Sequence, residues 1–420
     1  MAQSHSSLFL LLLFLLLVRQ TLQQRQQIST VDLNALVAIK KSLRDYSEFF
    51  SSWNFTSPDP CSTFAGVTCS LDPSSSSLLR VNSLTLGTGL SDSPGLSGSL
   101  SPFISNLTSL AQLLLFAGTV SGPIPPQLGH LNNLRVISLT NNLLSGPIPP
   151  TLVALPNLHT LDLSYNQLTG SLPPGLTELT QLKVLILASN RLSAELPHVR
   201  AQLLHLDLKK NGFSGRLPSL PSSLRYFSVS ENDMWGPING LESLSELVYL
   251  DLSMNRFNGT IPESLFQYRL SSMLLQRNSL SGGIPRSIAV DGVSSYGEGS
   301  IVDLSHNTLT GELSPVLAGV ESVFLNNNCL VGKVPEEYVT SLSQGTTKTL
   351  YLQHNYLSGF PLESGSVLPD SVSLCLSYNC MVPRVGVRAC PASAGGQLWR
   401  PVYQCSVFKN GTITMGEDRE

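Results

Sequence analysis

Histidine and cysteine are the side chains through which this protein could do chemistry, and their spacing limits what that chemistry could be. The seven histidines are scattered, and none lies at metal-ligand spacing from a cysteine. The motifs that hold a serine nucleophile, a catalytic zinc ion or a nucleotide phosphate are not found in the sequence. We therefore expect no enzymatic activity, no metal site and no cofactor.

The seven cysteines are expected to be mostly oxidised, because the chain begins with a secretory signal. Leu8 to Val18 is an unbroken apolar run, long enough for such a signal and too short to span a bilayer. Cys329 is left over and is either a partly buried free thiol or half of an intermolecular disulfide. Four cysteines near the C-terminus allow three connectivities: Cys375, Cys380, Cys390 and Cys405.

Hydrophobic runs, net charge and glycosylation sequons indicate where the protein is located and which partners it lacks. We assign residues 1–24 to the signal peptide and expect no transmembrane anchor, because no other stretch approaches 18 apolar residues. The net charge is −3 and only 13% of the residues are charged, so we expect no nucleic-acid partner. Four Asn-x-Ser/Thr sequons predict N-glycosylation at Asn54, Asn106, Asn258 and Asn410.

A pattern of leucines around an asparagine recurs along most of the chain. Around Asn142 it reads Leu134-x-x-Ile137-x-Leu139-x-x-Asn142-x-Leu144-x-Gly146-x-Ile148-Pro149. Together with two degenerate turns upstream, about thirteen turns fill residues 79–382. The later turns place the same asparagine at Asn166, Asn190, Asn211, Asn232, Asn255, Asn278, Asn307, Asn328, Asn355 and Asn379.

Each position of this pattern has a physical role. The apolar residues that flank Ser138 alternate with period two, so they lie on one side of a short strand and its spacer residues lie on the other. One such strand cannot bury its apolar face, and stacked turns are needed to close a continuous core. The asparagine amide is expected to satisfy backbone groups at the bend, and Gly146 permits a left-handed backbone. The sequence thus predicts an α/β repeat solenoid.

The Leu-x-Gly-x-Ile-Pro half of the turn resembles the plant extracellular subclass of leucine-rich repeats. Upstream, Asp32 to Leu43 resembles the helix that precedes such arrays, and Asp59 to Cys69 resembles the paired-cysteine cap of the family. The resemblance implies a right-handed, curved superhelix with a parallel β-sheet on its concave face and with disulfide-bonded caps. It also implies a Cys61–Cys69 disulfide, an N-terminal cap over residues 25–78, and a C-terminal cap and polar tail over residues 383–420.

Ligand-binding residues are expected among the strand spacers, which point outward on the concave face. Most spacers are small and polar, so the large or charged ones are the candidates, and we expect them to form one stripe. Aromatic residues and arginine are the types that interfaces use at their centres. Aspartates that share one register (Asp162, Asp207, Asp251 and Asp303) are expected to serve the repeat itself. The candidates are His205, Lys209, Tyr226, Tyr249, Leu274, Arg277, His306, Phe324, Tyr351 and His354.

The lengths of the turns vary. Asn190, Asn211 and Asn232 follow one another at intervals of 21 residues, which predicts a tight outer connection in these turns. Asn278 and Asn307 are 29 residues apart because Val290 to Gly299 is inserted between them. Such an insert is either a tolerated surface loop or part of a binding face.

The protein families that this chain resembles recognise molecules outside the cell. The resemblance implies a protein of the apoplast, the cell wall or the outer face of the plasma membrane that binds an extracellular peptide or protein ligand. We interpret the chain as a receptor-like or co-receptor component of cell-surface signalling, with a membrane receptor kinase as a partner. The alternative is a defence inhibitor of secreted polygalacturonase-type hydrolases, whose arrays are shorter and more regular. A passive wall protein would be expected to carry a Ser-Pro-rich extension.

Overall fold

The computed structural model describes residues 26–75, 77–90, 94–267, 270–285, 296–362, 367–381, 390, 392 and 399–407. The chain divides into two compact units, Met1–Thr160 and Leu161–Glu420. The expected signal peptide at residues 1–24, the sequon at Asn410 and most of the insert after Val290 lie outside the described residues. No helix of the described part is long and apolar enough to cross a membrane.

The first unit begins with a cap that is closed by buried aromatic and charged groups. Trp53 is only 2% exposed, stacks on Phe64 with ring centroids 5.2 Å apart, and donates a hydrogen bond from Nε1 to the Ala65 carbonyl. Asp32 is fully buried and pairs with the Arg80 guanidinium at 3.0 Å. The elements of the cap are β1 (Gln27–Ile28), α2 (Thr30–Ser42), β2 (Leu43–Asp45), η1 (Phe49–Ser52), α3 (Pro60–Thr63) and β3 (Val67–Leu71).

The rest of the first unit consists of repeats whose strands join two sheets. The leucine-rich half of each turn forms a strand of one sheet, named the major sheet here, in the order β1-β4-β6-β8, and β3 pairs antiparallel with β4. The glycine half forms a second sheet in the order β2-β5-β7-β9. The strands are β4 (Leu78–Leu86), β5 (Leu96–Ser99), β6 (Gln112–Leu115), β7 (Thr119–Gly122), β8 (Val136–Ser138) and β9 (Leu143–Pro147).

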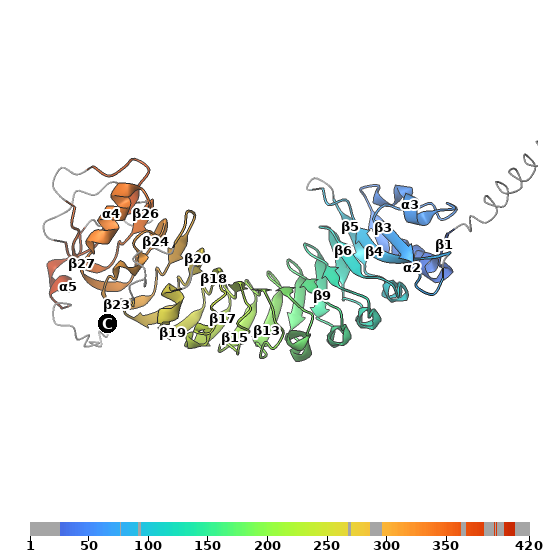
Figure 1. The fold of residues 1–420 in the computed structure, drawn as a ribbon, viewed down its shortest axis with the longest axis horizontal. Helices are drawn as coiled ribbons and strands as arrows, with labels where there is room; N and C mark the ends of the chain where they lie inside the picture. The colour runs from blue at the N-terminus through green and yellow to red at the C-terminus, as the bar shows by residue number, and fades with distance from the viewer. Residues whose placement is uncertain are drawn as a thin grey trace, which may run out of the picture. The chain divides into compact units, whose positions relative to one another are not determined.

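The second unit continues the same two-sheet pattern, and β10 (Thr160–Asp162) lies at the boundary of the units. Its major sheet runs in chain order and all its described pairs are parallel (Figure 1). The major strands are β12 (Val184–Ile186), β14 (His205–Asp207), β16 (Tyr226–Ser228), β18 (Tyr249–Asp251), β20 (Ser272–Leu274), β22 (Ile301–Asp303), β24 (Ser322–Phe324), β26 (Thr349–Tyr351) and β28 (Ser373–Cys375).

The second sheet was absent from the sequence prediction. The predicted solenoid with a parallel sheet is confirmed, but the glycine halves also pair with one another, because most offer a short extended segment beside a left-handed glycine, and one has the left-handed Ala194 in its place. In the second unit these strands are β11 (Gln167–Gly170), β13 (Arg191–Glu195), β15 (Gly212–Gly215), β17 (Asp233–Gly236), β19 (Arg256–Thr260), β21 (Ser279–Gly282), β23 (Thr308–Glu312), β25 (Cys329–Lys333) and β27 (Tyr356–Gly359).

The ladder asparagines satisfy backbone groups at the bend, as the sequence predicts. The Asn232 amide donates to the carbonyls of Val229 and Ser230 in its own turn and to that of Leu208 in the preceding turn, at 3.0–3.1 Å. Its Oδ1 accepts from the Phe213 amide at 2.9 Å. The amides of the other second-unit turns also donate within the turn and to the turn before it, at Asn190, Asn211, Asn255, Asn278, Asn307, Asn328, Asn355 and Asn379.

The residue before each ladder asparagine adopts a left-handed backbone. Its φ lies between 52° and 57° from Asn141 to Tyr378, a region that residues with a Cβ seldom enter. The hydrogen-bonded asparagine that follows holds this conformation in place. Three candidate residues, Arg277, His306 and His354, occupy this position, so their side chains are aimed by the bend rather than by a strand.

The connections between the two sheets explain the unequal turn lengths. Most turns contain a short 3-10 helix, such as η5 (Pro174–Glu178) and η7 (Glu263–Phe266), whereas the two 21-residue intervals contain none. The 27-residue interval before Asn355 has room for a true helix, α4 (Glu336–Gln344), which ends at the left-handed Gly345. The other connections are η2 (Pro102–Asn106), η3 (Pro126–His130), η4 (Pro150–Ala154), η6 (Asn239–Leu241) and η8 (Pro315–Leu317).

Disulfides lie at both ends of the array. Cys61 pairs with Cys69 in the first unit. The connectivity that the sequence left open is Cys375 with Cys390 and Cys380 with Cys405, the latter joining the last ladder turn to α5 (Val402–Val407). Cys329 is a half-buried free thiol, and burial raises its pKa above the ordinary value. The thiol is therefore a poor nucleophile at neutral pH.

Candidate binding face

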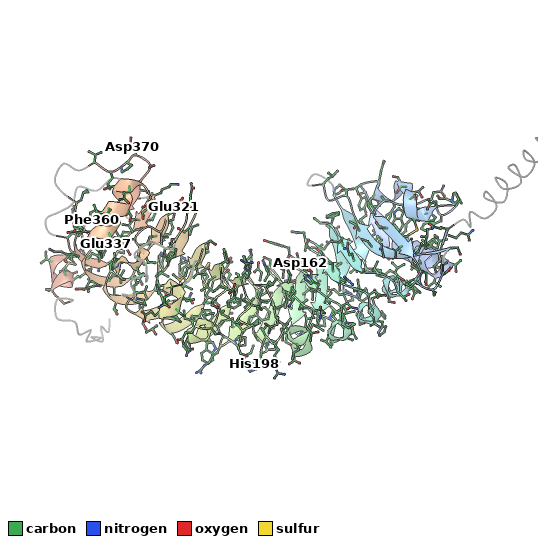
Figure 2. All side chains as sticks on the ribbon, in the orientation of Figure 1. Asp162, His198, Glu321, Glu337, Phe360 and Asp370 are labelled. Atoms are coloured by element: carbon green, nitrogen blue, oxygen red, sulfur yellow. A yellow bond between two sulfur atoms is a disulfide. The ribbon has the colours of Figure 1, made fainter. Side chains whose placement is uncertain are left out.

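The parallel register of the second unit sorts the outward side chains into rows. We number them by their distance before the ladder asparagine: the first row lies six residues before it, the second row four, the third row two, and the turn row one. The intervening residues, such as Leu206, Phe227 and Leu250, are buried in the core. Figure 2 labels Asp162 of the second row and His198 of an outer connection, and they lie on opposite sides of the second unit.

Three candidate residues form a continuous stack of rings in the first row. The register places Tyr226 between His205 and Tyr249 on adjacent strands. The His205 and Tyr226 rings are 4.0 Å apart at 4°, and the Tyr226 and Tyr249 rings are 4.4 Å apart at 3°. We call these three residues the ring stack. The strand spacing of about 4.8 Å is close to a stacking distance, so identical rotamers on adjacent strands align the rings.

The ring stack lies in a partly desolvated and acidic setting. Burial raises the pKa values of the Tyr226 and Tyr249 phenols, and the neighbouring Asp207 and Asp251 carboxylates raise them further. Burial lowers the pKa of His205, which favours a neutral imidazole at neutral pH. The stack is thus uncharged near pH 7 and is suited to contact through its ring surfaces.

The second-row aspartates bond to their own turns. Asp251 Oδ1 accepts from the Ser253 amide at 3.0 Å and from its hydroxyl at 2.6 Å. Asp207 accepts from the Lys209 amide at 3.1 Å and pairs with the Lys209 ammonium group at 3.6 Å. Burial lowers the pKa of Lys209, but Asp207 together with Tyr165 and Tyr249 raises it above the ordinary value. Asp162 and Asp303 make the same bond to the amide two residues on, so the predicted repeat-internal role is confirmed.

The remaining aromatic candidates form a separate pair. Phe324 and Tyr351 meet edge to face, with centroids 5.3 Å apart, and the Tyr351 hydroxyl lies 3.1 Å from the hydroxyl of Ser373. Both belong to the second row, whereas the ring stack belongs to the first, and β20 and β22 separate them. The prediction of one stripe is therefore wrong. The residue types are as expected, but the face carries two aromatic clusters.

The turn row adds charged and polar groups beside both clusters. Burial lowers the pKa of His306, and the charge of the exposed Arg277 lowers it further. The His306 Nε2 lies 3.3 Å from the amide nitrogen of Asn327, and His354 packs against the Tyr378 ring at 4.9 Å. Leu274 is half-buried in the second row, in register between Asp251 and Asp303.

Sequence reasoning missed two members of this face. Ile301 is 37% exposed in the first row, and Tyr378 contacts His354 in the turn row. Counting back from the ladder asparagines would have found both, since the offset alone assigns the row. It would also have separated the ring stack from the Phe324–Tyr351 pair.

A cavity of about 500 Å³ lies apart from these rows, in the segments that precede β22, β24 and β26. Lys348 lines the cavity, and its Nζ lies 3.4 Å from the Glu321 carboxylate and 3.9 Å from that of Glu298. The Glu321 carboxylate also accepts from the Gly299 amide at 2.7 Å, so the acid ties the end of the insert to the following turn. The charged residues of the cavity therefore stabilise the segments that connect neighbouring turns.

Two of the described sequons are well exposed. Asn54 lies on the cap, where its side-chain oxygen accepts from the backbone and hydroxyl of Thr56. Asn258 lies on β19 of the second sheet and therefore does not belong to the rows of the candidate face. Asn106 is half-buried at the end of η2. A glycan at Asn258 would leave the rows uncovered, and glycosylation stays a prediction.

Comparison with known proteins identifies both the cap and the repeats. The Leucine rich repeat N-terminal domain matches residues 29–70, the two-copy Leucine Rich repeats model matches 156–200, and the single Leucine Rich Repeat matches 133–155 and 246–268. Receptor-like protein 35 of Arabidopsis thaliana is 36% identical over 185 residues, which are 43% of this chain and 16% of that protein. This chain therefore spans only a small part of the curated relative.

Two solved structures extend the similarity over most of the chain. The leucine-rich-repeat ectodomain of the Arabidopsis thaliana membrane receptor kinase GASSHO1/SCHENGEN3, in complex with Casparian strip integrity factor 2, matches with a TM-score of 0.67 and 31% identity over 83% of this chain and 44% of its own. A plant ice-binding protein matches with a TM-score of 0.56 and 26% identity, over 81% of this chain and all of its own. The chain thus carries a leucine-rich-repeat N-terminal domain and leucine-rich repeats, and it is similar to a plant receptor-like protein and to the ectodomain of a plant receptor kinase.

Proposed function

We propose that this protein is a non-enzymatic extracellular recognition protein that binds a peptide or protein ligand on the outward rows of its second-unit major sheet. The observation that carries the proposal is the ring stack of His205, Tyr226 and Tyr249, half-exposed on a face of small polar residues. Aromatic rings held in one arrangement before binding lose little conformational entropy on contact, which makes them effective interface anchors.

The side chains, rather than the fold, indicate this kind of ligand. The same fold occurs in a receptor ectodomain in complex with Casparian strip integrity factor 2 and in an ice-binding protein, so the fold alone does not select a partner. A protein surface offers planar, charged and apolar groups, and the candidate face offers rings, Arg277 and Leu274 to meet them. The acids of the face are engaged in their own turns, which leaves them poorly placed for proton transfer.

We further propose a signalling role beside a membrane receptor kinase, and a location in the apoplast or at the outer face of the plasma membrane. The receptor-like relative and the receptor-kinase ectodomain support this role. The three disulfides favour an oxidising compartment. The second candidate, inhibition of secreted polygalacturonases, would use the same face for an enzyme surface.

The test is capture from plant cell-wall extract on the immobilised, glycosylated full chain. The variant replaces Tyr249, Arg277 and Tyr351 together with alanine, and the matched control replaces the exposed Trp235 and Arg256 of the second sheet. We expect the triple variant to lose the captured peptide or kinase ectodomain and the control to keep it. Equal capture by all three proteins would reject the assigned face, and inhibition of polygalacturonase activity would favour the second candidate.

A further inference from the structure

The ring stack ends abruptly on one side. In the first row the register runs from Tyr249 to Ser272 on β20 and then to Ile301 on β22. The Tyr249 ring contacts Tyr226 on one face, and the neighbour on its other face is only a serine. A bulky side chain returns at Ile301, which is 37% exposed. The row therefore contains a gap one residue wide, with a ring as one wall and an aliphatic side chain as the other.

The width of this gap suits a single flat group. Adjacent strands of a sheet are about 4.8 Å apart, so Tyr249 and Ile301 are separated by about 9.6 Å at the backbone. A planar group in contact with both walls needs about 7–8 Å, since carbon contacts are about 3.5–4.0 Å on each side. One planar group fits and continues the stack, whereas two do not.

The groups around the gap are mostly hydrogen-bond acceptors. In the second row Leu274 is flanked by Asp251 and Asp303, whose Oδ1 atoms are bonded within their turns. Among the described residues neither aspartate forms an ion pair, and the hydrogen bonds that they accept go to Oδ1, so Oδ2 is left for another donor even though Asp251 is only 8% exposed. In the third row of the same turn, the Gln276 Oε1 is buried without a hydrogen-bond partner. Buried polar atoms are normally paired, so this acceptor also calls for a donor.

The charges that face the gap leave it acidic. Lys209 lies near Tyr249 but is paired with Asp207. Burial raises the pKa of Asp303, and the charge of Arg277 in the turn row opposes that rise. Arg277 is exposed and makes no ion pair among the described residues. Two carboxylates therefore face one unpaired cation on the rim. A neutral ring in the gap would leave these acceptors unpaired, and a lysine ammonium, which is not planar, would satisfy them without stacking on the Tyr249 ring.

We propose that the gap bounded by Tyr249, Ser272, Ile301, Leu274 and the carboxylates of Asp251 and Asp303 binds the guanidinium group of an arginine in the ligand. The inference rests on the proposed function, because it names the side chain that an extracellular peptide places on this face. The guanidinium plane stacks on Tyr249, its N–H groups donate to the two carboxylates, and its methylene chain lies over Leu274.

The experiment uses saturation-transfer NMR on the full secreted chain, with acetyl-Gly-Arg-Gly-amide as the probe. The citrulline tripeptide, which is planar but neutral, and the lysine tripeptide are the comparison probes. We expect the arginine probe to bind roughly tenfold more tightly than either, because charge-assisted hydrogen bonds and stacking act together only for arginine. Equal binding of the arginine and citrulline probes, or no binding of the arginine probe, would overturn the proposal.

Three variants test the geometry of the gap, of which two alter the gap and one is a matched control. Ser272→Tyr adds a fourth ring to the ring stack, fills the gap and should abolish binding of the arginine probe. The control Ser322→Tyr lies in the same row two strands further along and should leave that binding intact. Replacing Asp251 and Asp303 together with asparagine keeps an Oδ1 acceptor for each turn and should bring the arginine and citrulline affinities together. Unchanged arginine binding by Ser272→Tyr would exclude the gap. That result would leave the proposed function standing if capture still depended on Tyr249, Arg277 and Tyr351.

Discussion

The cap of the first unit and the ring stack of the second use aromatic residues in opposite ways. In the cap, Trp53 contacts Phe50 edge to face at 4.7 Å and Phe64 by stacking at 5.2 Å, and all three are buried. In the ring stack, Tyr226 is sandwiched between two parallel rings that remain half-exposed. Mixed ring angles fill a volume, whereas parallel rings on adjacent strands line a surface.

This difference indicates what each cluster contributes. The cap rings replace the missing neighbour of the first repeat, so their burial stabilises the end of the array. The ring stack adds little to the core, because the residues beneath it, such as Phe227 and Leu250, already close the core. The cap cluster is therefore expected to govern folding and the ring stack to govern binding, and substitutions can separate the two roles.

The largest expected effect is on stability, at the cap. Trp53→Ala removes a ring that is 2% exposed and a hydrogen bond to the Ala65 carbonyl. We expect the free energy of unfolding of the cap to fall by about 3–5 kcal/mol, the usual cost of deleting a large buried aromatic side chain. Urea denaturation followed by circular dichroism measures the loss. A decrease below about 1 kcal/mol would show that the buried rings do not stabilise the cap as we propose.

A smaller effect is expected when the middle ring of the stack is removed. Tyr226→Ala breaks both ring contacts and should lower the free energy of unfolding by about 1–3 kcal/mol, since each aromatic pair contributes about 0.5–1.5 kcal/mol. It should also abolish ligand capture. Tyr226→Phe is the matched control, because it keeps the ring and removes the hydroxyl. If Tyr226→Ala destabilised the protein as much as Trp53→Ala, the division into folding and binding clusters would fail.

Much of the architecture could be predicted because every turn repeats the same local chemistry. The leucine alternation specifies the buried side of each strand, and Asn232 or Asn255 can satisfy its backbone partners only at the bend. The second sheet was missed because its strands are short and interrupted by left-handed glycines such as Gly236, which hides the alternation. Local patterns of this kind do not show which segments pair across turns.

The candidate face was predicted less completely, because residue type says little about relative orientation. Tyr226 and Tyr351 look alike in the sequence, yet an offset of two residues places them in different rows. The parallel planes of the ring stack depend on rotamers that only the packed structure defines. The gap at Ser272 is marked by a small residue, which becomes informative only when both neighbours in the row are known.

The smallest effect concerns the protonation of the stack at its His205 end. Burial lowers the pKa of His205 in the folded protein, against the opposing influence of Asp207 and Asp162, while Lys209 lowers it further. The unfolded chain therefore takes up this proton first as the pH falls below about 6.5, the ordinary histidine value. This favours unfolding, so the contribution of His205 to stability is lost between about pH 6.5 and its lower folded pKa.

His205→Gln removes this titration while retaining a planar polar side chain beside Tyr226. We expect the free energy of unfolding of the natural protein to fall relative to the variant when the pH is lowered from about 7.5 to about 5.5. Urea denaturation of both proteins at the two pH values gives the difference, in which the titrations of His306 and the carboxylates cancel. A constant difference would mean that the His205 ring is as solvated in the stack as in the unfolded chain. The ring stack would then be open to water at that end, and the contrast with the closed cap would be greater than the ring contacts alone indicate.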